Sequence, residues 1–181
     1  MKRLIIALIA AAGMVLLSPA SIAQTFAGSG TTTVSVVVAA EASLYISDST
    51  TTLSSTGTLF SDYAGTTHLT YKIRTTKTGG SGTITSLVTA DFSGTGGPSV
   101  ASPPSSGDAL TYTCSVSSPA TSCTGTQTAS TTVAQPVATF GADGHSAKAG
   151  NSGQLSWILT NDPQYKTGSY NATVTFTVSA T

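Results

Sequence analysis

Residues 170–181 read YNATVTFTVSAT, and this stretch decides the fold class. Apolar side chains occupy every second position, namely Tyr170, Ala172, Val174, Phe176, Val178 and Ala180. The positions between them carry Asn, Thr and Ser. Because successive side chains of a strand point to opposite faces of the sheet, this alternation predicts a half-buried β-strand.

The same period of two recurs along the chain. Residues 34–46 place apolar side chains at the even positions and predict a long strand. Further strands are predicted at 69–74, 84–92, 110–116, 137–140 and 155–159, with a weaker pattern at 127–133. The glycines at 79–82 predict that 69–74 and 84–92 form a hairpin, and the Gly- and Pro-rich segment 93–108 predicts a long exposed loop.

The composition supports an all-β domain. The 181 residues include 34 Thr and 27 Ser, and only 8% of the chain is charged, which disfavours solvent-facing helices. The absence of a basic excess argues against a nucleic-acid partner. We therefore predict a single Ig-like antiparallel β-sandwich of two sheets and about 7–8 strands, with Trp157 between the sheets and Thr on the outer faces.

The first 23 residues have the pattern of a secretory signal peptide. Lys2 and Arg3 precede the apolar run 4–17, and small residues at 21–23 predict cleavage before Gln24. An uncleaved membrane anchor is the competing interpretation, but the run is short for a span. We expect a β-sandwich domain at 24–181, exported to the periplasm or surface of a bacterium, with no membrane span in the mature chain.

The two cysteines are interpreted in the light of export. Cys114 and Cys123 lie nine positions apart with Pro119 between them. In an oxidising compartment, such a pair predicts one local disulfide that holds a turn between strands. Metal binding would need further Cys or His ligands nearby, which the sequence does not place there.

No catalytic or metal-binding pattern stands out. His68 and His145 are the candidate imidazoles, and Asp143 lies two positions before His145, but the spacing is not diagnostic of a catalytic triad. The acidic side chains are scattered through predicted turns and strand ends: Asp48, Asp62, Asp91, Asp108, Asp143 and Asp162. We predict a protein without enzymatic activity, cofactor or metal.

Both ends of the mature chain carry strand-like alternation. A Gly- and Thr-rich lead at 24–33 precedes the alternation at 34–46, and Gly168 precedes the stretch 170–181. This arrangement resembles exported fimbrial and spore coat protein U-type subunits. The resemblance implies that the sandwich polymerises by donating its N-terminal strand and that a chaperone binds the C-terminal strand. The implied assembly residues are Val34, Val36, Val38, Tyr170, Val174, Phe176 and Val178.

A second likeness is confined to residues 157–163, WILTNDP, which are similar to the Trp-x-Leu signature of wall-associated WxL domains. We predict a structural protein of the cell surface or matrix, a subunit of a fibre or coat that assembles through strand exchange. Its partners would be copies of itself or other envelope proteins. The alternative is a secreted module that binds carbohydrate or another surface polymer through Tyr45, Tyr63, Tyr165 or Tyr170.

Overall fold

The structure is a computed structural model that describes residues 29–181. The predicted signal peptide at 1–23 lies outside the described residues, as do residues 24–28. Residues 37–181 form one compact unit, and the residues before Val37 belong to a separate one. Within that separate unit, residues 29–36 belong to no strand, and their side chains are exposed.

The domain is all-β, as predicted. Seven strands have six residues or more, and three have only two. These are β1 (Glu41–Ile46), β2 (Ser54–Ser55), β3 (Tyr63–Arg74), β4 (Gly82–Ala90), β5 (Leu110–Val116), β6 (Thr121–Ser122), β7 (Gln127–Thr128), β8 (Gln135–Phe140), β9 (Asn151–Leu159) and β10 (Thr173–Ala180). Within residues 29–181, no helix is long and apolar enough to cross a membrane.

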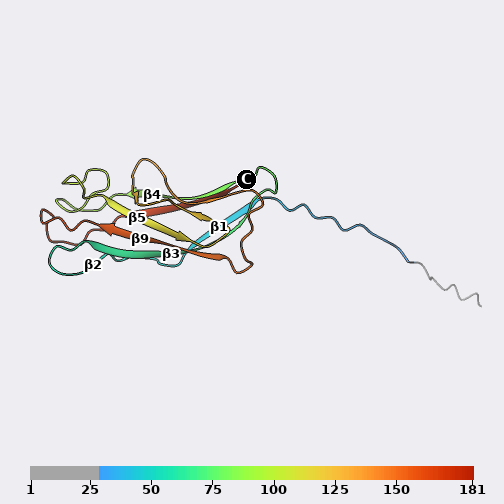
Figure 1. The fold of residues 1–181 in the computed structure, drawn as a ribbon, viewed down its shortest axis with the longest axis horizontal. Helices are drawn as coiled ribbons and strands as arrows, with labels where there is room; N and C mark the ends of the chain where they lie inside the picture. Colours follow the sequence, from blue (N-terminus) through green and yellow to red (C-terminus); the bar gives the residue numbers. More distant parts are fainter. Residues whose placement is uncertain (1–28) are drawn as a thin grey trace, which may run out of the picture. The chain divides into compact units, whose positions relative to one another are not determined.

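The strands form two antiparallel sheets, which we call sheets A and B (Figure 1). Sheet A has the order β1-β3-β9-β5-β7, with β2 also paired to β3, and sheet B has the order β10-β4-β8-β6. The predicted hairpin of β3 and β4 is wrong, because residues 75–81 carry the chain from sheet A to sheet B. Both strands need their apolar faces on one core, and placing them in opposite layers achieves this.

The core lies between the sheets. Trp157 on β9 is only 4% exposed there, which confirms the sequence prediction. Its indole Nε1 donates to Thr67 Oγ1 at 2.9 Å, so its polar atom is satisfied. The buried hydroxyl of Tyr112 donates to the Pro136 carbonyl at 2.9 Å. The core therefore buries aromatic rings without leaving these polar groups unpaired.

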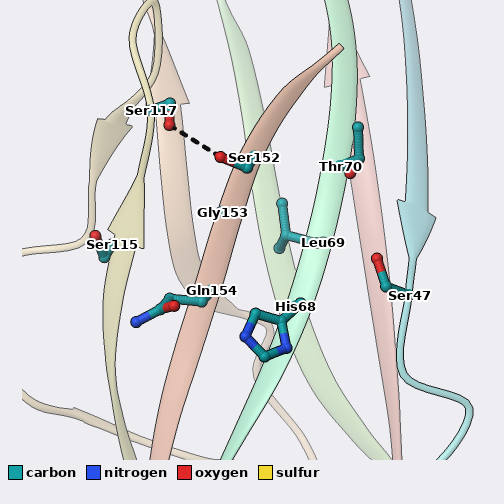
Figure 2. Close-up of a pocket in the computed structure, with 9 residues that line it drawn as sticks. All are labelled: Ser47, His68, Leu69, Thr70, Ser115, Ser117, Ser152, Gly153 and Gln154. Carbon is teal, nitrogen blue, oxygen red and sulfur yellow. Dashed lines mark hydrogen bonds between the residues drawn. The ribbon is translucent and has the colours of Figure 1, made fainter. Parts of the chain in front are cut away.

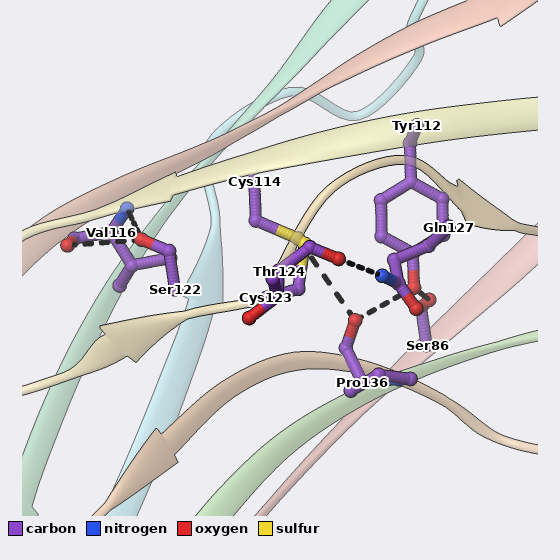
Figure 3. Close-up of a disulfide and its surroundings, with 9 residues drawn as sticks. All are labelled: Ser86, Tyr112, Cys114, Val116, Ser122, Cys123, Thr124, Gln127 and Pro136. Carbon is purple, nitrogen blue, oxygen red and sulfur yellow. Dashed lines mark hydrogen bonds between the residues drawn. A yellow bond between two sulfur atoms is a disulfide. The ribbon is translucent and has the colours of Figure 1, made fainter.

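One side of the sandwich is closed by a chain segment and a disulfide. Residues 117–134 contain β6, at the edge of sheet B, and β7, at the edge of sheet A. Cys114 on β5 is bonded to Cys123, which confirms the predicted disulfide (Figure 3). The backbone N–H of Cys123 donates to Val137 on β8 at 2.9 Å. The disulfide thus joins sheet A to the edge of sheet B as well as bridging a local turn.

Several boundaries differ from the sequence prediction: β3 and β9 begin earlier than expected, at Tyr63 and Asn151, and of 127–133 only Gln127–Thr128 is a strand. Of the predicted strand 34–46, only 41–46 pairs with a neighbour, as β1. The last strand begins at Thr173, so Tyr170 precedes it. Alternation shows that a segment can form a strand, but a strand also needs an edge to pair with. Residues 34–40 have no such partner among the described residues.

Candidate functional site

The side of the sandwich opposite the disulfide is formed by two edge strands that lie close to each other. β1 ends sheet A there and β10 ends sheet B. On the inner strands β3, β4 and β9, most core-facing side chains are buried. On β1 and β10, every core-facing side chain stays partly exposed. They are Ala42, Leu44, Ile46, Val174, Phe176, Val178 and Ala180. We call this strip of incompletely covered core the seam.

The backbone of β10 is also incompletely paired. Thr181 N donates to Ser81 O at 2.8 Å, and this pair is in register with the ladder that joins β10 to β4. Ladder bonds in an antiparallel pair occur at every second residue, so the odd-numbered residues of β10 bond to β4. The N–H and C=O groups of Val174, Phe176 and Val178 therefore point toward the open edge. The seam therefore presents both apolar side chains and backbone N–H and C=O groups that an added strand could bind.

The predicted donor residues have matching properties. Val34, Val36 and Val38 are 91%, 82% and 61% exposed. They share the even phase of the core-facing residues of β1. Val37, in the other phase, is 95% exposed as well, so four valines of this segment face water. This segment, which we call the donor segment (residues 31–40), has the chemistry of a strand that lacks a sheet.

The predicted assembly residues are thus only partly brought together. Val174, Phe176 and Val178 line the seam. Tyr170 does not: a Cβ on Gly97 would lie 2.1 Å from its ring, so the ring rests against the backbone at Gly97. Its hydroxyl donates to the Lys166 carbonyl at 2.8 Å. Tyr170 therefore holds two loops together at the end of the domain where β10 begins.

Sequence reasoning missed two features near the seam. Ala42, Leu44 and Ile46 were predicted as strand residues but not as partly exposed residues at the edge of the core. Leu59 and Phe60 lie between β2 and β3 and are 91% and 62% exposed. Two adjacent large apolar residues within a run of Ser, Thr and Gly could have indicated an exposed apolar contact site.

His68 lies in a shallow polar groove of about 390 Å³ on the outer face of sheet A (Figure 2). Asp48 accepts hydrogen bonds from the backbone N–H of His68 at 2.6 Å and from its ring Nδ1 at 2.9 Å. These bonds lower the pKa of Asp48. The nearby hydroxyls of Ser117 and Ser152 bond to each other. No described hydroxyl is bonded to the His68 ring, so the groove holds no assembled pair of nucleophile and base.

His145 is the second candidate imidazole. His145 Nε2 lies 3.7 Å from Asp143 Oδ1 in the loop between β8 and β9, and both side chains are 57% exposed. Within residues 29–181, no three His, Cys, Asp or Glu side chains gather as a metal site would require. Backbone hydrogen bonds from Thr75 N to Gly144 O and from Asp143 N to Thr76 O, each 3.0 Å long, join this loop to the end of β3. Its visible role is to join strand ends.

The clearest electrostatic perturbation lies at the loop end of the domain. Asp108 is only 3% exposed, and burial together with the neighbouring Asp162 carboxylate raises its pKa. The pKa of Asp162 is lowered, first by the hydrogen bond from Gln164 N. Burial and the two carboxylates raise the pKa of Tyr165 to about 12. This cluster joins the loops before β5 and after β9, and sequence spacing gave no sign of it.

The four tyrosines predicted for carbohydrate binding occupy different settings. Tyr45 is 66% exposed on the outer face of β1. Tyr63 and Tyr165 are half-buried, and Tyr170 rests on Gly97. Carbohydrate binding by these side chains stays a prediction.

The chain was compared with protein-family models, with curated proteins and with solved structures. None of the three comparisons gave a match.

Proposed function

We propose that this protein is an exported structural subunit that assembles with copies of itself by strand addition. The donor segment of one copy would lie along the free edge of β10 in the next copy. The observation that carries the proposal is the partly exposed core along β1 and β10, in a chain that also exposes an unpaired apolar alternation. Each of these features is costly in water, and pairing them removes both costs.

The expected gain is large enough to sustain an assembly. Burying a Val side chain contributes about 1.5–3 kcal/mol, and the three donor valines would together contribute about 5–9 kcal/mol before ordering costs are subtracted. The N–H and C=O groups at the edge of β10 would gain strand partners at the same time. Ordering the donor segment offsets part of this gain.

The direction of the added strand follows from the sheet. Every strand pair in sheet B is antiparallel, and antiparallel pairing forms the better-aligned hydrogen bonds. In the register we propose, Val36 of the donor lies opposite Phe176. Val34 then lies opposite Val178, and Val38 lies opposite Val174. All three donor valines face the core in this register.

Export forms part of the proposal. The signal pattern at 1–23 would direct the chain out of the cytoplasm, where the Cys114–Cys123 disulfide can form and persist. We place the subunit at the cell surface, or in the periplasm on its way there, in a fibre or coat. Low charge and a Thr-rich outer face suit a protein that packs against its own copies.

The test is the assembly state of the chain purified after export. We expect oligomers or filaments by light scattering and electron microscopy, and monomers from the variant Val34→Asp, Val36→Asp, Val38→Asp. A matched control places the same charges in the opposite phase, at Ser35, Val37 and Ala39, and should still assemble. A monomeric wild-type chain, or equal loss of assembly in both variants, would falsify the proposal.

A further inference from the structure

The loop between β2 and β3 presents two large apolar side chains to water. Leu59 and Phe60 form its tip, and we call this pair the knob. The loop is held by hydrogen bonds from Thr56 N to Asp62 O and from Ser61 N to Thr58 O, each 3.1 Å long. The knob is therefore presented on an ordered turn.

The backbone of the knob is itself costly. Phe60 has a φ of 58°, in the left-handed region that a residue with a bulky side chain rarely adopts. Such a conformation is unfavourable, and it persists only where surrounding contacts impose it. Here it turns the Phe60 ring outward while the Ser55 and Ser61 hydroxyls bond to each other beneath the tip at 2.8 Å.

The knob lies at one mouth of the seam. Residues 63–64 of β3 pair with β9 on one edge, so β2 must lie on the other edge, which is the edge that β1 also occupies. Asn161 Nδ2 donates to the Ser61 carbonyl at 3.2 Å and ties the knob loop to the connection that leads into β10. The knob thus lies at the end of the sandwich where β10 begins, because the other end of β10 contacts Thr76 just after β3, next to the start of β1.

We propose that the knob packs on Val38 of a second copy's donor segment and clamps that segment where it leaves the seam. This inference depends on the proposed strand addition. An antiparallel donor ends its run beside Val174, near the start of β10, and Val38 is the donor valine at that end. Val34 lies four residues earlier, about 13 Å away along an extended strand, and is out of reach of the knob.

A double-mutant cycle tests the contact. The acceptor is the exported chain with Val34, Val36 and Val38 changed to Asp, so that it cannot donate. The probe is a labelled synthetic peptide of residues 29–40, and binding is followed by fluorescence anisotropy. The knob variant is Leu59→Ser with Phe60→Asn, because Asn tolerates the left-handed backbone. Val133→Ser, which removes another exposed apolar side chain, is the control.

We expect the knob variant to bind the wild-type peptide about tenfold more weakly, because a contact between two side chains is lost when one of them is removed. With a Val38→Ala peptide, which already lacks the contact, the knob substitutions should lower the affinity less than about twofold. With a Val34→Ala peptide they should lower it by the full tenfold, because the effects of distant sites are additive. Circular dichroism should show the same fold for all acceptors. The clamp alone is overturned if the knob variant weakens binding of the wild-type and Val38→Ala peptides equally. It is also overturned if the loss of affinity disappears with the Val34→Ala peptide instead. If the wild-type peptide does not bind, strand addition and the clamp both fail.

Discussion

The partial exposure of the seam predicts that two apolar truncations in sheet B will behave differently. Ile84 on β4 is fully buried, so Ile84→Ala should cost about 2–5 kcal/mol of unfolding free energy whether or not a strand is added. Phe176 on β10 is only partly enclosed. In an isolated subunit, Phe176→Ala should cost about 2–3 kcal/mol, which is less than the usual 3–5 kcal/mol for an enclosed Phe.

Strand addition would complete the enclosure of Phe176, so the substitution should cost about 1.5 kcal/mol more in the complex than in the free subunit. This difference corresponds to about tenfold weaker binding of the donor peptide. Ile84→Ala, in contrast, should change the affinity less than about twofold, because Ile84 is already enclosed before binding.

Two measurements on the non-donating acceptor check this prediction. Urea unfolding followed by the fluorescence of Trp157, the single tryptophan, gives the stability of the free subunit. Anisotropy of the labelled peptide gives the affinity. If Phe176→Ala leaves the affinity unchanged, or if Ile84→Ala lowers it as much, the seam is not the site of strand addition and the reasoning is refuted.

Three further outcomes are expected. Replacing both Cys114 and Cys123 by Ala should lower the unfolding free energy by about 2.5–3 kcal/mol in urea titrations at constant pH, because the disulfide closes a ring of about ten residues. Burial of Asp91 would raise its pKa, but hydrogen bonds from its neighbours outweigh burial and lower the pKa. The ionised Asp91 should therefore stabilise the fold fully above the ordinary pKa of Asp, and this stabilisation should fade as the pH falls below that value. Asp91→Asn should remove this acid-dependent loss, as measured by urea midpoints. Asp108→Asn should lower the pKa of Tyr165 from about 12 without restoring its ordinary value, since burial remains, and titration of the phenolate absorbance measures this shift.

The sequence predicted the architecture well where local pattern and core burial agree. The alternation at 170–181 and the single Trp157 led to a two-sheet sandwich, because period and apolar content are local properties. The pairing of β3 with β9 instead of β4 was not predictable, since nothing local separates a hairpin from a crossing between layers.

The candidate site was predicted in part. The valines at 34–38 were recognised as strand-like, but their lack of a partner is a property of the whole sheet and not of the segment. The same holds for Phe176, which is partly exposed because, among residues 29–181, β10 pairs on one side only, with β4. The Asp108 cluster was hidden for a related reason: its members lie far apart in sequence and meet only when two loops converge.

The course of β10 along the whole seam has a mechanical consequence. In a fibre joined by the donor segment, tension between neighbouring copies would act along the strands and not across them. The hydrogen bonds of the added strand would then be loaded in shear, so that all of them bear the force together and cannot open one after another. The disulfide on the far side would keep the two layers from sliding apart under the same pull. Such a fibre would yield by sudden rupture at one joint, at a force that depends on the number of paired donor residues.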